Sequence, residues 1–82
     1  MKYYTYILRS QVDGRLYKGH ASDIEKRLKE HNSGKTKSTK GYIPWEIVYY
    51  EEFETKGEAI EREKFFKTGF GREYIKSKLD KK

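Results

Sequence analysis

The chain has 82 residues, of which 34% are hydrophobic, which excludes a second core and predicts one domain over residues 1–82 with a small aromatic core. It has no cysteine and no long apolar run, which excludes disulfide bonds, thiolate metal sites and membrane spans and favours a cytoplasmic protein. Nineteen Lys and Arg against thirteen Asp and Glu give a formal net charge of +6, which favours a polyanionic partner, although a solvated basic surface explains it equally well.

The start of the chain predicts a hairpin of two strands. Residues 3–9 (YYTYILR) and 15–19 (RLYKG) are rich in aromatic and branched side chains, and Asp13-Gly14 between them is typical of a tight turn. Side chains alternate along a strand, so Tyr17 and Lys18 are expected on opposite faces.

The same hairpin can bring Tyr6 beside Tyr17. Tyrosine pairs are usually core or cross-strand packing, so this pair alone does not indicate a site. Gly19 would let backbone or ligand approach closely at the end of the strand, although a simple turn into the next helix explains it nearly as well.

A helix is predicted in SDIEKRLKEHNSG, opened by a capping box of Ser22 and Glu25 and closed by Gly34. Its buried stripe contains Ile24 and Leu28, which lie one turn apart.

Two polar residues, Arg27 and His31, border that stripe. Taken alone, His31 is expected to be a half-buried histidine near a helix C-terminus, and Arg27 to cover apolar surface with its stem.

Residues 34–44 (GKTKSTKGYIP) predict a basic loop with cations at Lys35, Lys37 and Lys40. Residues 45–53 (WEIVYYEEF) predict a third strand with both faces partly covered, in which Trp45, Ile47 and Tyr49 share one face.

Thr55 and Glu58 form a second capping box, which starts another helix that Gly69 or Gly71 should end. The tail REYIKSKLDKK predicts a short amphipathic helix or frayed chain. The fold class is therefore α/β, with a small three-stranded, mainly antiparallel sheet flanked by helices in the order β-β-α-β-α-(α).

Glu63 occupies an unexpected place on that second helix. With about 100° per residue and Ala59 at zero, Phe66 falls at about 340° and Glu63 at about 40°, inside the apolar arc. Glutamate is seldom buried without a partner, so this carboxylate is either paired with Arg27 or Arg62 or faces a cleft where it binds a cation.

These segments together resemble the GIY-YIG endonucleases, and among them the small single-domain members related to the nuclease module of bacterial excision repair. The match covers nearly the whole chain in order: YYTYIL, YKG, SDIEKRLKEHNSG, PWEIVYYEEF and EAIEREKFF. Order and spacing together make it specific.

The resemblance implies a metal-dependent endonuclease acting on nucleic acid, with DNA as the expected substrate and repair or recombination as the expected process. It implies that one Mg²⁺ or Mn²⁺ ion is held by Glu63 and that Arg27 binds the phosphoryl oxygens. Tyr17 would accept the proton of the attacking water and Tyr6 would position the water or phosphate. On residue chemistry alone, His31 would be preferred to Tyr17 as the proton acceptor.

Lys35, Lys37 and Lys40 are expected to hold the nucleic-acid backbone, with affinity that depends on salt. Two alternatives to the nuclease remain: a nucleic-acid-binding module that keeps the fold with little or no cleavage, and a surface that serves only protein contacts. An isolated module of this size could also act as a homodimer or with a partner protein.

Overall fold

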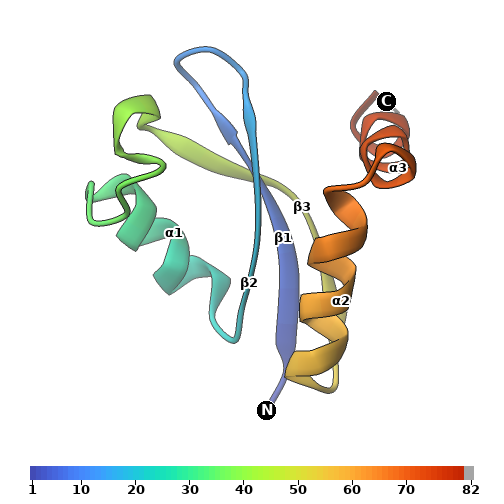
Figure 1. Cartoon of the computed structure of the whole chain (residues 1–82). Helices are drawn as coiled ribbons and strands as arrows, with labels where there is room; N and C mark the ends of the chain where they lie inside the picture. The colour runs from blue at the N-terminus through green and yellow to red at the C-terminus, as the bar shows by residue number, and fades with distance from the viewer. Residues whose placement is uncertain (81–82) are drawn as a thin grey trace.

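A computed structural model describes residues 1–80 (Figure 1). Three strands and three α-helices follow one another in the predicted order, with one 3₁₀ turn before the third strand. Their bounds are β1 Tyr3–Ser10, β2 Leu16–Ala21, α1 Ile24–Asn32, the 3₁₀ turn Lys40–Tyr42, β3 Trp45–Phe53, α2 Lys56–Phe66 and α3 Gly69–Asp80. The predicted α/β fold class is confirmed. No helix in the described part of the chain is long and apolar enough to cross a membrane.

The sheet is antiparallel, with β1 between β2 and β3. The predicted hairpin is confirmed, because Tyr6 pairs with Gly19 across β1 and β2 and Gly14 turns the chain with a φ of +80°. Glycine adopts that left-handed conformation without steric cost. As the central strand, β1 carries a run of buried residues from 5 to 8.

β3 has the predicted bounds but not the predicted faces. The register against β1 slips at Val48, because Ile7 pairs with Tyr49 whereas Leu8 pairs with Ile47. Such a bulge adds one residue and reverses the alternation beyond it. Ile47 consequently packs on the α1 side of the sheet and Tyr49 on the α2 side, so the expectation that they share a face was wrong.

The first helix starts one residue later than the predicted capping box requires. Asp23, not Ser22, caps α1, and its carboxylate accepts a hydrogen bond from the Lys26 amide. A carboxylate accepts that bond and also favours the positive end of the helix dipole. At the other end Gly34 has a φ of +84° and closes the helix as expected.

The helices lie on opposite faces of the sheet, with α1 on one side and α2 and α3 on the other (Figure 1). The α1 side has a core of Tyr6, Leu8 and Trp45, against which Ile24 and Leu28 pack as predicted. The core on the other side consists of Ile7, Phe66 and Ile75. One strand therefore supplies buried side chains to both clusters, and the small core expected from the sequence is divided in two by the sheet.

The second helix ends earlier than either predicted glycine. The predicted capping box of Thr55 and Glu58 is confirmed at its start, but α2 ends at Phe66 with Lys67 as its C-cap. Gly69 begins α3 instead of ending α2, because the Thr68 hydroxyl accepts a hydrogen bond from the Gly71 amide and provides a new helix start.

Gly71 allows α3 to begin against the last turn of α2. It is buried, and a Cβ on this residue would lie 1.8 Å from the Phe65 carbonyl oxygen. Such a contact with backbone cannot be relieved by a rotamer change, so the angle between α2 and α3 depends on this glycine.

We therefore expect Gly71→Ala to lower the free energy of unfolding by about 1 to 3 kcal/mol, as overpacking does in other cores. Urea denaturation measures the change. Gly57→Ala is the matched control, because no atom lies within 4 Å of its Cβ position. Alanine in a helix should leave that variant equal to wild type or more stable by up to about 1 kcal/mol. Equal stabilities of the two variants would contradict the packing argument.

Candidate active site

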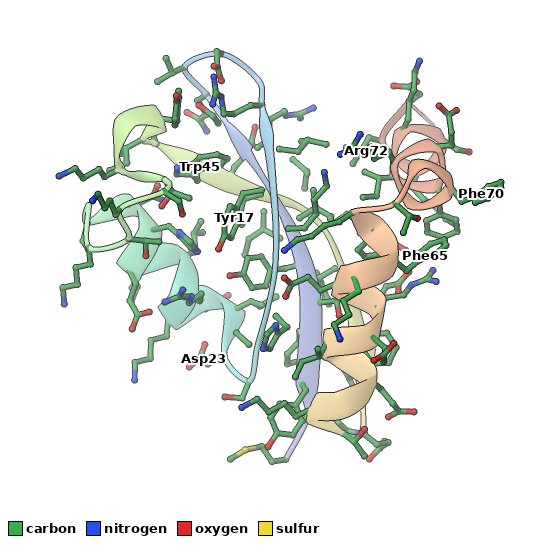
Figure 2. All side chains as sticks on the ribbon, viewed as in Figure 1. Tyr17, Asp23, Trp45, Phe65, Phe70 and Arg72 are labelled. Atoms are coloured by element: carbon green, nitrogen blue, oxygen red, sulfur yellow. The ribbon has the colours of Figure 1, made fainter. Side chains whose placement is uncertain are left out.

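Two tyrosines and a histidine form a compact aromatic cluster on the α1 side of the sheet. The expected neighbourhood of Tyr6 and Tyr17 is confirmed, with ring centroids 6.5 Å apart. His31 from α1 packs edge-on against Tyr17 at 4.9 Å. Tyr17 and Trp45 lie together between α1 and the sheet in Figure 2. Tyr17 is half-buried, whereas Tyr6 is 2% exposed and His31 is 0% exposed.

His31 is more deeply buried than expected because both of its ring nitrogens have partners inside the protein. Its Nε2 lies 3.3 Å from the Tyr6 hydroxyl, and its Nδ1 lies 2.8 Å from Thr39 Oγ1. The Thr39 hydroxyl itself donates to the Thr36 carbonyl, which leaves its lone pair to accept from Nδ1–H. Nε2 is then the acceptor, and Tyr6 donates to it.

The pKa values agree with these roles. Burial, assisted by the nearby Arg27 cation, lowers the pKa of His31, so its ring is neutral at neutral pH. Burial raises the pKa of Tyr6 to about 12, although Arg27 acts in the opposite direction. Tyr6 therefore keeps its proton.

Arg27 projects from α1 at the rim of this cluster. Its Nη1 donates to Glu30 Oε1 at 2.8 Å, and both side chains are about one third exposed. These two residues help to line an open hollow of about 170 Å³ beside the start of α1. A guanidinium has five N–H donors, so the pairing with Glu30 leaves donors for another anion.

Gly19 shapes the cluster from the neighbouring strand. A Cβ on Gly19 would lie 2.5 Å from the Tyr6 hydroxyl oxygen and 2.6 Å from the ring carbon that bears it. The glycine is therefore needed for close approach of the Tyr6 side chain, whereas the sequence suggested approach of backbone or ligand, or a simple turn.

Glu63 is indeed a largely buried carboxylate, but neither expected arginine is its partner. Its side chain is 17% exposed; Oε1 lies 2.5 Å from His20 Nδ1 and Oε2 accepts from Lys67 Nζ at 2.7 Å. Arg27 pairs with Glu30, and Arg62 pairs with Glu51 at 2.7 Å. Pairing of Glu63 with Arg27 or Arg62 is thus excluded.

These neighbours keep Glu63 ionised. Burial alone would raise its pKa, but the hydrogen bonds from Lys67 and His20 outweigh burial and hold the pKa below its ordinary value. The carboxylate is therefore available as an anionic ligand at neutral pH.

His20 is the site residue that the sequence analysis missed. It directly follows Gly19 and, by alternation along β2, faces the α2 side together with Lys18. The sequence contains one signal for it, a histidine at the end of the strand after Tyr17. Its partner on α2 could not be foreseen, since 43 positions separate His20 from Glu63.

The end of β2 brings the two sides of the sheet together. Tyr17 belongs to the α1 side, whereas His20 and Glu63 belong to the α2 side. The Glu63 charge makes a small contribution to the raised pKa of Tyr6, which is due mainly to burial. A ligand at this edge of the sheet could meet groups from both sides.

The predicted basic loop is present, with Lys35, Lys37 and Lys40 all exposed. Its conformation is fixed from inside. Thr39 is buried, and its carbonyl accepts a hydrogen bond from the Trp45 indole at 2.9 Å.

The residues around Glu63 fit a cation that takes few protein ligands. No cluster of three or more His, Cys, Asp or Glu side chains able to hold a metal occurs among residues 1–80. Mg²⁺ is commonly bound through one or two carboxylates, with water and substrate phosphate completing its shell. Glu63 supplies one ionised carboxylate, whose neighbours are His20 and the exposed Lys67, and a cation would have to replace one of them.

Comparison with known proteins gives a consistent result. A family model described as the GIY-YIG catalytic domain matches residues 2–77. A UPF0213 protein of Staphylococcus saprophyticus is 50% identical over 68 residues, covering 82% of each chain. One of Bacillus pumilus is 48% identical over 67 residues, covering 80% of this chain and 67% of the relative.

A solved structure supports the fold. The solution NMR structure of a UPF0213 protein from Bacillus halodurans is 36% identical, has a TM-score of 0.56, and covers 94% of this chain and 84% of its own. None of these three names states an activity.

The close approach of Tyr6 to Gly19 can be tested by a double-mutant cycle. We expect Gly19→Ala to lower the free energy of unfolding, and the loss to be smaller in a Tyr6→Phe background, because the nearest clashing atom is the hydroxyl oxygen. The expected coupling is about 0.5 to 3 kcal/mol by urea denaturation. Gly41→Ala, whose Cβ position is open, should be nearly neutral. Additive losses would show that the two residues do not interact.

The burial of neutral His31 predicts a pH dependence of stability. The unfolded histidine, with a pKa of about 6.5, takes up a proton as the pH falls, whereas folded His31 resists it because its pKa is lowered. Its stabilising contribution is therefore complete above that unfolded pKa and is lost as the pH falls through it. Urea denaturation at about pH 7.5 and 5.5 should show a smaller loss for His31→Gln than for wild type. Equal losses would mean that His31 is not the group responsible.

Proposed function

Because this chain belongs to the GIY-YIG family of nuclease domains, we propose that it is a divalent-metal-dependent endonuclease that hydrolyses phosphodiester bonds in DNA. The observation that carries the proposal is Glu63, an ionised and largely buried carboxylate that contacts His20 on β2, the strand that also holds Tyr17 and Gly19. The proposal treats residues 1–82 as one domain, with repair or recombination as the process it serves.

Glu63 would hold one Mg²⁺ or Mn²⁺ ion, which when bound supplies Lewis-acid stabilisation of the charge on the phosphoryl and leaving oxygens. In this role Glu63 exchanges the Lys67 ammonium for the metal. Lys67 is exposed and joined to the carboxylate by an i,i+4 pair, an interaction of modest strength that a divalent ion can replace.

Arg27 would bind the phosphoryl oxygens that gain charge during the reaction. It is partly exposed, retains donors beyond its pair with Glu30, and lies close enough to Tyr6 to affect the pKa of the phenol. A guanidinium placed in this way stabilises a developing negative charge more than the ground state.

We assign proton transfer from the attacking water to Tyr17. Tyr17 is only half-buried, whereas His31 is 0% exposed and already bonded through both ring nitrogens, which argues against direct contact of His31 with water. A phenol is a weak base at neutral pH, so this role requires a cation bound close to the Tyr17 hydroxyl. Tyr6 stays protonated and positions the water or phosphate.

Lys35, Lys37 and Lys40 would bind the DNA backbone through exposed ammonium groups. Such contacts position the strand and carry little sequence information. Sequence or structure preference would then come from a second copy of the chain or from a partner protein.

A second function deserves a test because both Glu63 oxygens already have partners within the chain. A carboxylate satisfied by His20 and Lys67 would suit a nucleic-acid-binding module that no longer cleaves. This alternative keeps the DNA interface and loses the metal.

Glu63→Gln separates the two functions. We expect loss of DNA cleavage by at least about a hundredfold, since removing a group that stabilises transition-state charge typically costs that much. Backbone amide shifts around residue 63 on addition of Mg²⁺ or Mn²⁺ should also disappear. Glu61→Gln on the exposed side of α2 is the matched control and should cleave as wild type does.

DNA binding by Glu63→Gln should persist and weaken steeply with salt. Cleavage by Glu63→Gln at the wild-type rate would remove Glu63 from the mechanism. Salt-dependent binding by a wild-type protein that neither cleaves nor binds metal would establish the binding module instead.

A further inference from the structure

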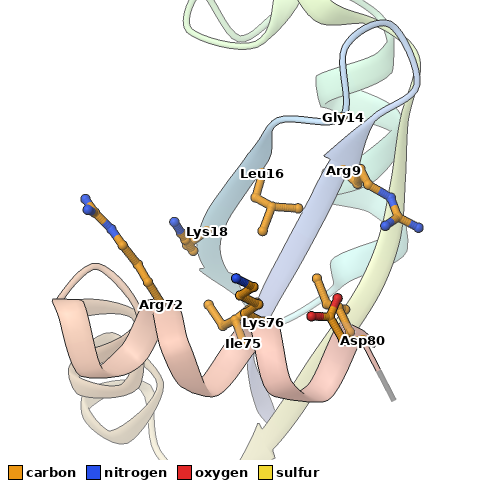
Figure 3. Close-up of a pocket in the computed structure, with 9 residues that line it drawn as sticks. Arg9, Gly14, Leu16, Lys18, Arg72, Ile75, Lys76 and Asp80 are labelled. Atoms are coloured by element: carbon orange, nitrogen blue, oxygen red, sulfur yellow. The ribbon is translucent and has the colours of Figure 1, made fainter. Parts of the chain in front are cut away.

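A cationic hollow lies on the α2–α3 side of the sheet, outside the site described above. It has a volume of about 270 Å³ and opens between the β1–β2 hairpin and α3. Figure 3 shows Leu16 and Lys18 on β2 and, across from them, Arg72 and Lys76 on α3.

Cations outnumber acids among the side chains that line this hollow. Lys18, Arg72 and Lys76 line it, and within residues 1–80 no acid lies within 4.0 Å of these three cations to form an ion pair. Lys18 is half-buried, and burial together with the Arg72 and Lys67 cations lowers its pKa. An excess of cations without ion-pair partners favours an anion.

The remainder of the hollow has a different chemistry. Leu16, Ile75 and Leu79 give it an apolar floor. Asp80 and Arg9 also line it, and Arg9 has Glu46 as a partner at 3.6 Å. A fitting ligand would combine an anionic group, a flat apolar body and polar edges, which are the parts of a nucleotide.

The hollow also adjoins the candidate active site. Lys18 and His20 share a face of β2 two residues apart, a separation of about 7 Å along the strand. Lys67 links the two places, because it pairs with Glu63 and its charge also acts on Lys18.

We propose that the hollow between β2 and α3 binds a nucleotide of the substrate strand, with its phosphate on Lys18 and Arg72 and its base on the floor formed by Leu16 and Leu79. The proposal rests on the proposed function, since it takes the strand at Glu63 to be DNA. In this proposal α3 is part of the DNA interface, and it helps to fix the position of the DNA strand relative to Glu63.

Binding can be measured without cleavage by NMR titration in the absence of divalent ions. The probes are inorganic phosphate, deoxyadenosine monophosphate and a single-stranded DNA of about ten nucleotides, a length within the range of single-strand sites. We expect the mononucleotide and the DNA to shift amides of β2 and α3 around the hollow. The mononucleotide should bind at least about tenfold more tightly than phosphate, because it adds the apolar contact.

Two variants with the same change of net charge test the assignment. Lys18→Gln with Arg72→Gln should weaken mononucleotide binding by about tenfold or more, since two charge-assisted contacts are lost. Lys29→Gln with Lys56→Gln removes two exposed cations elsewhere and should change it by less than about twofold. Leu79→Ser should reduce mononucleotide affinity towards that of phosphate while leaving phosphate binding unchanged. Dispersed amide spectra confirm that each variant is folded.

Equal weakening by the two double variants, or no shifts around the hollow with either nucleotide probe, would overturn the proposal. Shifts with the mononucleotide but not with the DNA would also overturn it, because the hollow would then bind free nucleotides. Nucleotide binding at the hollow in a protein that does not cleave DNA would retain this site and reject the nuclease. If the wild-type protein cleaves DNA but the two double variants lose mononucleotide affinity equally, the nuclease is retained and this site is rejected.

Discussion

The structure depends on one strand that is packed on both faces and hydrogen-bonded along both edges. β1 pairs with β2 and β3, and it sends Tyr6 and Leu8 to one core and Ile7 to the other. A chain of this size cannot fill two cores independently, so every element is placed relative to β1. α1 contacts one face of a narrow sheet and α2 the other, and the short strand β2 lies at the open edge between them.

This arrangement explains why polar groups from both helices can meet at the end of β2. β2 is the edge strand next to β1. On one face Glu63 from α2 contacts His20 on β2, and on the other Tyr6 from β1 contacts His31 on α1. Gly19 leaves the space that the Tyr6 hydroxyl occupies beside β2. The cost of burying the carboxylate is offset by two donors, which is the condition under which such a group is tolerated in a fold.

The sequence was informative where local chemistry decides the structure. Periodicity and capping gave the strands and helices, because Thr55 with Glu58 and the bounds of residues 45–53 depend on neighbouring residues. Prediction failed where a distant contact decides. The bulge at Val48 depends on pairing with β1. The start of α3 at Gly69 is a different case, because the Thr68 cap is local and the sequence analysis overlooked it.

In the candidate site, too, features set by nearby residues could be predicted and features set by distant contacts could not. Angular position on the helix was enough to single out Glu63, and alternation placed Tyr6 near Tyr17. The partners of Glu63 are 4 and 43 positions away, and neither charge nor spacing ranked His20 or Lys67 above the two arginines. The full burial of His31 required the position of Thr39, which a loop sequence does not reveal.

The buried contacts of Thr39 have a consequence for the loop that carries Lys35, Lys37 and Lys40. Thr39 joins this loop to His31 and Trp45, and the Asn32 side chain bonds both the amide and the carbonyl of Trp45. The three ammonium groups therefore extend from a loop whose backbone is anchored to the core, and not from a free loop. Ordering a free loop costs about 1 to 2 kcal/mol per residue in backbone entropy. Because folding already orders this loop, binding of a ligand to it would not include that entropy loss.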